Sequence, residues 1–206
     1  MIDLLFAVAL ATSACAADPA GAQGEPRCVP QPANWRTTAT DEDRRRIREW
    51  REAWESALEQ ARAGNASEVA GEGALLDPDA ALLDPLPPPG DYHCRTIKLG
   101  TPSTDLLTYI AYPPFRCRIR NEGGRITFTK LSGSQRPIGR LFPDLERRMV
   151  FLGTLQLGDE SRTYQYGVDE ERNLAGLLER VGERRWRIVF PYPHFESLLD
   201  VIELTP

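Results

Sequence analysis

The sequence lacks the residues and motifs on which several function classes depend. It has no run of 18 apolar residues, which excludes an ordinary membrane-spanning helix. With two histidines, His93 and His194, and no C-x-x-C pair, it gives little support to a metal site. A G-x-S-x-G elbow, a P-loop, a G-x-G-x-x-G fingerprint and an H-E-x-x-H pair are also missing, so no cofactor and no familiar catalytic class is indicated.

The composition is typical of a globular protein. Of the 206 residues, 41% are hydrophobic and 27% are charged, and 25 basic against 30 acidic side chains give a formal net charge of -5. The acidic balance argues against a general nucleic-acid binder. The length favours one domain with an appendage.

Residues 1–16 have the pattern of a secretory signal peptide. An apolar run from Leu4 to Ala11 precedes small residues, although the usual basic residues before it are missing. Cleavage before Ala17 fits the A-x-A rule, whereas lipidation of Cys15 would make the protein a bacterial lipoprotein, and the sequence leaves both open. We therefore expect an exported protein, with membrane contact only through Cys15.

The cysteines support a disulfide if the chain is exported, because thiols tend to pair in an oxidising compartment. Cys94 and Cys117 both lie in strand-like segments and are the expected pair. The alternative is two buried thiols. Cys28 lies in a Pro-rich segment and is left over, to remain free, to pair with Cys15 or to link two chains.

The first part of the chain has helical and extended segments. Residues 17–34 are rich in Pro, Gly and Ala and predict a flexible tether, and residues 35–90 predict a helical appendage with a Pro-rich connector. Thr40 is the expected N-cap of a helix that stops at Gly64-Asn65. The apolar residues of this helix recur at spacings of three and four: Ile47, Trp50, Trp54, Ala57, Leu58 and Ala61. This stripe either docks on the following domain or stays exposed for a partner.

From residue 91 to 206 the hydrophobic period changes to two, which predicts an antiparallel β domain. Further segments with strand character flank the clear strand at 115–120: 92–99, 125–131, 136–142, 149–157, 162–168, 173–181, 185–190 and 198–204. Pro137 and Gly139 indicate an edge or bent strand, and 173–181 could instead form a helical turn. We expect a mainly β protein with an N-terminal helical appendage, its β domain a small antiparallel barrel, or a sandwich, of about eight strands.

Candidate binding residues come from two places. Arg116, Arg118 and Arg120 alternate along one strand and share a face, so they could bind a carboxylate or a phosphate. Alternatively they form a solvated surface or the docking face for the acidic helix. Near the C-terminus, Tyr192 and His194 are candidates for a ligand mouth. They belong to an aromatic group that could equally form barrel core: Trp186, Phe190, Tyr192 and Phe195.

Seven segments of the chain carry a family resemblance: GDYHCRTIKLG (90–100), FRC (115–117), SGSQRP (132–137), LFPD (141–144), MVFLGT (149–154), WRIVFP (186–191) and PHFESLLDVIEL (193–204). Together they resemble an uncharacterised family of exported proteobacterial proteins known only as a domain of unknown function. The likeness runs from about Trp35 to the C-terminus. It implies a bacterial envelope protein, in the periplasm or anchored at the outer membrane of a Gram-negative bacterium, and implies no activity or site residues.

The functional expectation is a non-catalytic, exported cell-envelope protein whose β domain binds or inhibits. Its partner is an unknown envelope protein or a small ligand, not a nucleic acid. One alternative is an envelope hydrolase that uses His194 with Glu196. A second alternative is a structural envelope lipoprotein.

Overall fold

The computed structural model describes residues 34–103 and 106–206. The expected signal peptide, Cys15, Cys28 and almost all of the expected tether lie outside the described residues. The helical elements are α1 (Trp35–Thr38), α2 (Asp41–Arg48), α3 (Trp50–Gly71), and the short 3-10 helices η1 (Gly73–Leu75) and η2 (Glu170–Arg172). The strands are β1 (Gly90–Leu99), β2 (Tyr109–Ala111), β3 (Phe115–Glu122), β4 (Arg125–Lys130), β5 (Gln135–Leu145), β6 (Arg148–Leu157), β7 (Asn173–Gly182), β8 (Arg185–Pro191) and β9 (Leu199–Thr205).

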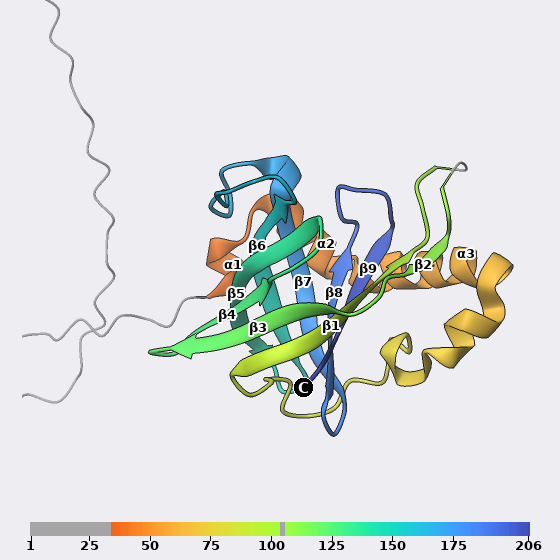
Figure 1. Cartoon of the computed structure of the whole chain (residues 1–206), viewed down its shortest axis with the longest axis horizontal. Coiled ribbons are helices and arrows are strands. Elements are labelled where there is room, and N and C mark those ends of the chain that lie inside the picture. Colours follow the sequence, from red (N-terminus) through yellow and green to blue (C-terminus); the bar gives the residue numbers. More distant parts are fainter. Residues whose placement is uncertain (1–33, 104–105) are drawn as a thin grey trace, which may run out of the picture. The chain divides into compact units, whose positions relative to one another are not determined.

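The strands form a closed antiparallel barrel (Figure 1). Each strand from β3 to β9 pairs with the next one along the chain, and β1 pairs with β3 at one edge and with β9 at the other. This circuit contains eight strands and confirms the expected barrel. The short β2 continues the β3 edge of β1, where Ala111 lies opposite Ile97. Closure leaves no long unpaired edge for another chain to join.

Side chains alternate between the interior of the barrel and its outer face. On β1, Tyr92 and Cys94 belong to the interior core, whereas Ile97 and Leu99 belong to a cluster that includes α3. The interior core is dominated by large apolar side chains: Ile119, Phe128, Leu141, Phe151, Leu178, Trp186, Ile188, Phe190, Ile202 and Leu204. At one end of the barrel, Tyr92 and Trp186 pack edge to face with ring centroids 6.0 Å apart.

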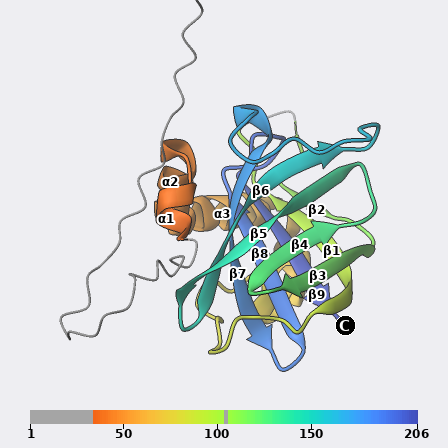
Figure 2. The same ribbon diagram turned by 90° about the vertical axis from the view of Figure 1, so that its left-hand side faces the viewer.

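The helices cover part of the outer face of the barrel. Trp54 of α3 is fully buried against residues of β1, β8 and β9, so the apolar stripe docks on the β domain. Trp35 and Ile47 pack against residues of β5, β6 and β7. Figure 2 shows α1 and α2 on the side of the barrel away from β3 and β4. Within the described residues, no helix is both long and apolar enough to cross a membrane.

A buried ion pair fastens the helical segment to the barrel. Arg187 on β8 is fully buried and binds Glu179 on β7, with Nη2 2.7 Å from the Glu179 carboxylate. The same guanidinium donates to the main-chain oxygens of Leu75 and Asp77, and it lies 4.4 Å from the centre of the Trp54 ring. Because all of these partners are desolvated, losing one of them leaves the others unsatisfied.

The predicted disulfide is confirmed. Cys94 and Cys117 are bonded inside the barrel, with their Cα atoms 5.8 Å apart, and both side chains are buried. The bond links β1 to β3 near the point along β1 where its pairing partner changes from β3 to β2. It therefore holds β1, which also pairs with β9 to close the barrel, against β3.

The break expected at Gly64-Asn65 is present, because Asn65 has a non-helical backbone conformation with φ −140° and ψ 44°. Further helical turns follow it, so that α3 extends to Gly71, and Val69 of these turns is buried in the cluster against the barrel. One expectation about secondary structure is wrong. Residues 162–168 form a loop instead of a strand, and the Tyr166 hydroxyl of this loop bonds to Asp43 on α2.

Of the two alternatives for the strand with Pro137 and Gly139, an edge strand or a bent strand, the edge strand is excluded, since β5 pairs with both β4 and β6. Proline has no main-chain N–H to donate to a neighbouring strand. Pro137 is tolerated because the pairing of β5 with β4 ends at Ile138, one residue before it is reached. Gly139 lies opposite Gly153, where a Cβ atom would approach the neighbouring backbone to about 2.4 Å, and the Phe151 ring fills the space. Residues 173–181, which could have been helical, belong to β7.

Candidate functional site

The end of the barrel opposite the Tyr92–Trp186 contact contains a cavity of about 130 Å³. Its wall is formed by β1, the beginning of β3, the end of β4, the beginning of β5, parts of β6 to β9, and the loop between β8 and β9. The apolar part of the wall is Phe115, Pro137, Leu155, Leu174, Phe190, Pro193, Phe195 and Ile202. The polar part is Thr96, Lys98, Lys130, Ser134, Gln135, Glu196 and Asp200, together with Tyr112.

Lys98 is a buried lysine whose charge is compensated. Its Nζ lies 3.1 Å from Oδ2 of Asp200 and 3.4 Å from Oε2 of Glu196. Burial alone would lower the pKa of Lys98. The two carboxylates raise this pKa by more than burial lowers it, so the net pKa is raised. Asp200 also accepts a hydrogen bond from the Ser197 hydroxyl. This part of the cavity is a closed ionic network.

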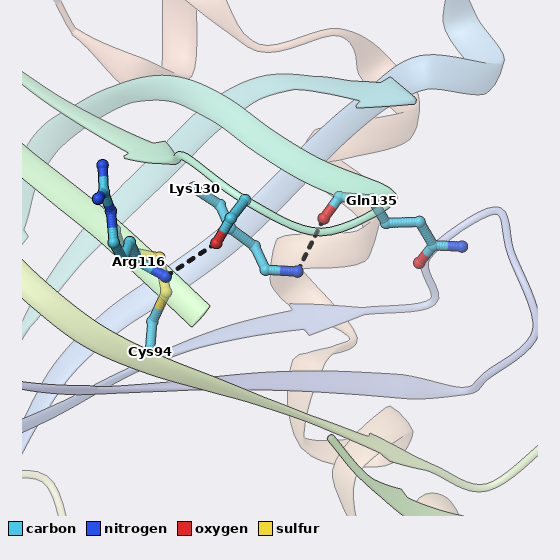
Figure 3. Close-up of a disulfide and its surroundings, with 6 residues drawn as sticks. Cys94, Arg116, Lys130 and Gln135 are labelled. Atoms are coloured by element: carbon cyan, nitrogen blue, oxygen red, sulfur yellow. Dashed lines mark hydrogen bonds between the residues drawn. A yellow bond between two sulfur atoms is a disulfide. The ribbon is translucent and has the colours of Figure 1, made fainter. Parts of the chain in front are cut away.

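Lys130 is a buried lysine without such compensation. Its side chain is on a residue that is only 4% exposed, and its Nζ donates to the main-chain oxygen of Gln135 at 2.9 Å (Figure 3). The Phe115 ring lies 4.0 Å from the same nitrogen. Among the residues that the structure describes, no carboxylate forms an ion pair with Lys130. Burial lowers the pKa of Lys130 to about 8.

The turn between β4 and β5 is shaped around this ammonium group. Gly133 has a φ of +93°, and a Cβ at this position would lie 3.1 Å from Lys130 Nζ and 3.0 Å from the Phe115 ring. A side chain here would therefore be strained and would displace the ammonium group. Arg136 holds the turn in place by donating to the main-chain oxygens of Gly133 and Leu157.

Thr96 supplies a second unsatisfied polar group. Its residue is 8% exposed, and within the described part of the chain its hydroxyl has no hydrogen-bond partner. Buried hydroxyls are normally paired, so an orphan that lines a cavity points to an occupant with polar atoms.

The loop between β8 and β9 covers part of the cavity and is conformationally strained. Tyr192 and Glu196 have φ values of 46° and 69°, in the left-handed region that non-glycine residues rarely adopt. Hydrogen bonds hold the loop: Tyr192 donates to the Leu198 oxygen, and Leu198 donates to the Leu99 oxygen. The strained backbone conformation at Glu196 places its carboxylate within ion-pair distance of Lys98.

The arginines predicted as binding residues lie on the outer face of β3. Arg116 and Arg120 are exposed, and Arg118 binds the Asp91 carboxylate through two nitrogens. With Arg125 and other residues of β4 and β5, Arg118 and Arg120 line a shallow exposed groove. The helix does not dock here, because the apolar stripe is buried against β1, β8 and β9 instead.

Tyr192 and His194 do not line the cavity, although their neighbours Pro193, Phe195 and Glu196 do. Tyr192 packs against the outer cluster around α3.

His194 accepts a hydrogen bond from Arg46 on α2, with 2.6 Å between Nη2 and Nε2. Burial and the Arg46 charge lower the pKa of His194. Its partner in the hydrolase alternative, Glu196, is held by Lys98. The two side chains therefore have separate partners.

Sequence reasoning missed Thr96, Lys98, Lys130 and Asp200. A compositional signal was present, because the chain has only two lysines among its 25 basic residues, and the structure brings both to one cavity. Everywhere else the chain uses arginine.

The comparisons with known proteins identify a family and no function. No curated protein and no solved structure matches the chain. The family described as Domain of unknown function (DUF4893) matches residues 35–204, which contain the helices and almost the whole barrel. The chain therefore belongs to the DUF4893 family.

Proposed function

We propose that this protein is a non-catalytic binding protein that holds a small molecule in the cavity at the end of its barrel. One observation carries the proposal: the cavity combines apolar walls with two buried donors, Lys130, which donates to Gln135 alone among the described residues, and Thr96, whose hydroxyl has no partner there. Ligand sites in proteins have this character, with apolar walls and a few convergent polar groups.

The size of the cavity limits the ligand. A cavity of about 150 Å³ lined by apolar side chains accepts benzene. The cavity here, at about 130 Å³, is of similar size and is partly open to solvent. A ligand of roughly six to ten non-hydrogen atoms fits this volume.

The proposal can be tested by ligand-observed NMR with a set of small acids, amides, alcohols and amines of that size. Leu174→Phe places a ring in the cavity wall and is expected to abolish binding. Val168→Phe is the matched control, because Val168 is 68% exposed and lies outside the cavity. Saturable binding that survives Val168→Phe but not Leu174→Phe supports the proposal. Absence of binding by every member of the set, or equal binding by the Leu174→Phe variant, refutes it.

We also propose that the protein is exported and acts in the periplasm or at the outer membrane. The Cys94–Cys117 disulfide supports this proposal, because structural disulfides persist in oxidising compartments. Alkylation and mass mapping of protein taken directly from its source cells provide the test. Finding Cys94 and Cys117 reduced there would contradict export. Fractionation of Cys15→Ala separates a lipid anchor from a soluble protein, since only an anchored protein changes its fraction.

A further inference from the structure

We propose that the ligand of the cavity is a small organic monoanion, a carboxylate with an apolar body, and that Lys130 binds its charge. This inference rests on the proposed function and specifies the chemistry of the ligand. It follows from the distribution of charge, of hydrogen-bond donors and of apolar surface around the cavity.

Among the described side chains around the cavity, Lys130 is a cation without a carboxylate partner. The groups that face Lys130 are Asp200 on β9, Lys98 on β1, Arg136 on β5 and Glu196 in the neighbouring loop. Both carboxylates already bind Lys98, and Asp200 also accepts from Ser197.

Arg136 and Lys98 are positive and can only repel the Lys130 ammonium group. A buried ammonium group normally has a carboxylate partner, so the missing partner is an anion supplied from outside.

The available donors match the two oxygens of a carboxylate. An ammonium group has three N–H donors, and among the residues that the structure describes Lys130 has one hydrogen-bond acceptor, the Gln135 main-chain oxygen. The Thr96 hydroxyl lines the same cavity and has no partner among the described residues. A carboxylate accepts through both oxygens, and hydrogen bonds from a charged donor are the strong ones.

The apolar wall argues for an organic ion rather than an inorganic one. Leu155, Leu174 and Ile202 face the same cavity as Lys130 and offer no hydrogen bond. A phosphate or sulfate ion would leave this wall against water or empty space, whereas the hydrocarbon part of a carboxylic acid would cover it. A dianion would also exceed the single uncompensated positive charge.

The same geometry predicts how binding depends on pH. The anion binds the ammonium form of Lys130, and burial lowers the pKa of this group to about 8 in the empty cavity. Above that pH the free protein must first take up a proton, so the affinity falls about tenfold per pH unit. The anion in turn raises the pKa of Lys130, because it favours the charged form.

The test compares acids with neutral molecules of the same shape. Butyrate, hexanoate, benzoate and phenylacetate are titrated against the full chain by calorimetry, each beside its own amide, at about pH 7 and about pH 9.5. At the lower pH the acids are expected to bind at least about tenfold more tightly than the amides, as for a charge-assisted hydrogen bond. This preference disappears in Lys130→Met, weakens by a few-fold in Thr96→Val, and persists in Arg120→Met, which removes a surface charge from the outer face.

Each outcome separates the two proposals. If acids and amides bind equally to the native chain, the inference is overturned while the binding function stands. If neither class binds, both proposals fail. Carboxylate affinity that is unchanged between the two pH values also overturns the role of Lys130, and this measurement needs no variant. Equal carboxylate affinity of Lys130→Met and the native chain overturns it as well.

Discussion

Replacing Lys130 by methionine is expected to stabilise the ligand-free protein, which is an unusual result for a buried position. Methionine keeps an unbranched, flexible side chain that is one atom shorter than that of lysine, and it removes the charge. The ammonium group has one main-chain acceptor and the Phe115 ring, and no ion-pair partner among the described residues. Its removal therefore relieves a desolvation penalty without leaving a carboxylate unpaired.

The pKa of Lys130 sets the size of the effect. It falls from an ordinary 10.5 to about 8 in the folded protein. This difference corresponds to about 3 kcal/mol of unfavourable free energy for the charged form. The penalty is complete below about pH 8, where the folded and unfolded states both carry the proton. Between about pH 8 and 10.5 the unfolded state keeps a proton that the folded state has lost, so stability rises with pH. After the loss of the Gln135 hydrogen bond, we expect Lys130→Met to gain about 2 kcal/mol at pH 7.

Urea unfolding followed by tryptophan fluorescence measures this gain between about pH 7 and pH 9.5, below the ordinary pKa of tyrosine. The advantage of the variant should shrink as the pH rises. Lys98→Met is the matched comparison, because its removal leaves the Asp200 and Glu196 carboxylates without their cation and should destabilise the protein. A Lys130→Met variant that is less stable than the native chain at pH 7, or a difference that does not vary with pH, would refute the reasoning.

Three further substitutions test the fold. Replacing Cys94 and Cys117 together by alanine should lower the free energy of unfolding by about 3 kcal/mol, from the loop that the disulfide closes, and urea unfolding with and without reductant checks it. Arg187→Met should cost about 3–5 kcal/mol in thermal unfolding, because the buried Glu179 Oε2 then loses its donors and only Oε1 keeps its ion pair with Arg148; the double variant with Glu179→Gln should recover part of the loss, because the neutral amide costs less to bury than the carboxylate. Gly153→Ala should prevent normal folding, seen as loss of the near-ultraviolet circular dichroism, because its Cβ would lie 2.3 Å from the Ile138 oxygen.

The parts of the fold that follow from local pattern were predictable. Alternation of Phe115, Cys117 and Ile119 with arginines identified β3, because one face of that strand is buried and the other is solvated. The disulfide followed from two cysteines in such strands. The stripe that contains Trp54 required a cover, and the barrel provides it.

The polar cavity was not predictable from local pattern, because it depends on which face of each strand the helices cover. On β1, Ile97 and Leu99 point outward and are apolar because α3 covers them, while Thr96 and Lys98 point inward. Alternation alone would place the apolar pair inside. The error at 162–168 has a similar origin, since Tyr166 is used to reach Asp43 and not to continue a ladder. Tertiary contacts decided both cases.

The comparison of the two basic surfaces favours an interior site over a docking surface. Arginines of the outer face are solvated or paired, as Arg118 is with Asp91, and exposed pairs of this kind contribute little free energy. The interior lysines are different, because Lys130 keeps a charge in a place where folding alone would favour a neutral side chain. Groups that lower stability persist where function needs them, and they cluster at binding sites. We expect Lys130→Met to raise the free energy of unfolding and Lys98→Met to lower it. This contrast would identify Lys130 as the group kept for ligand binding, and so locate the binding site.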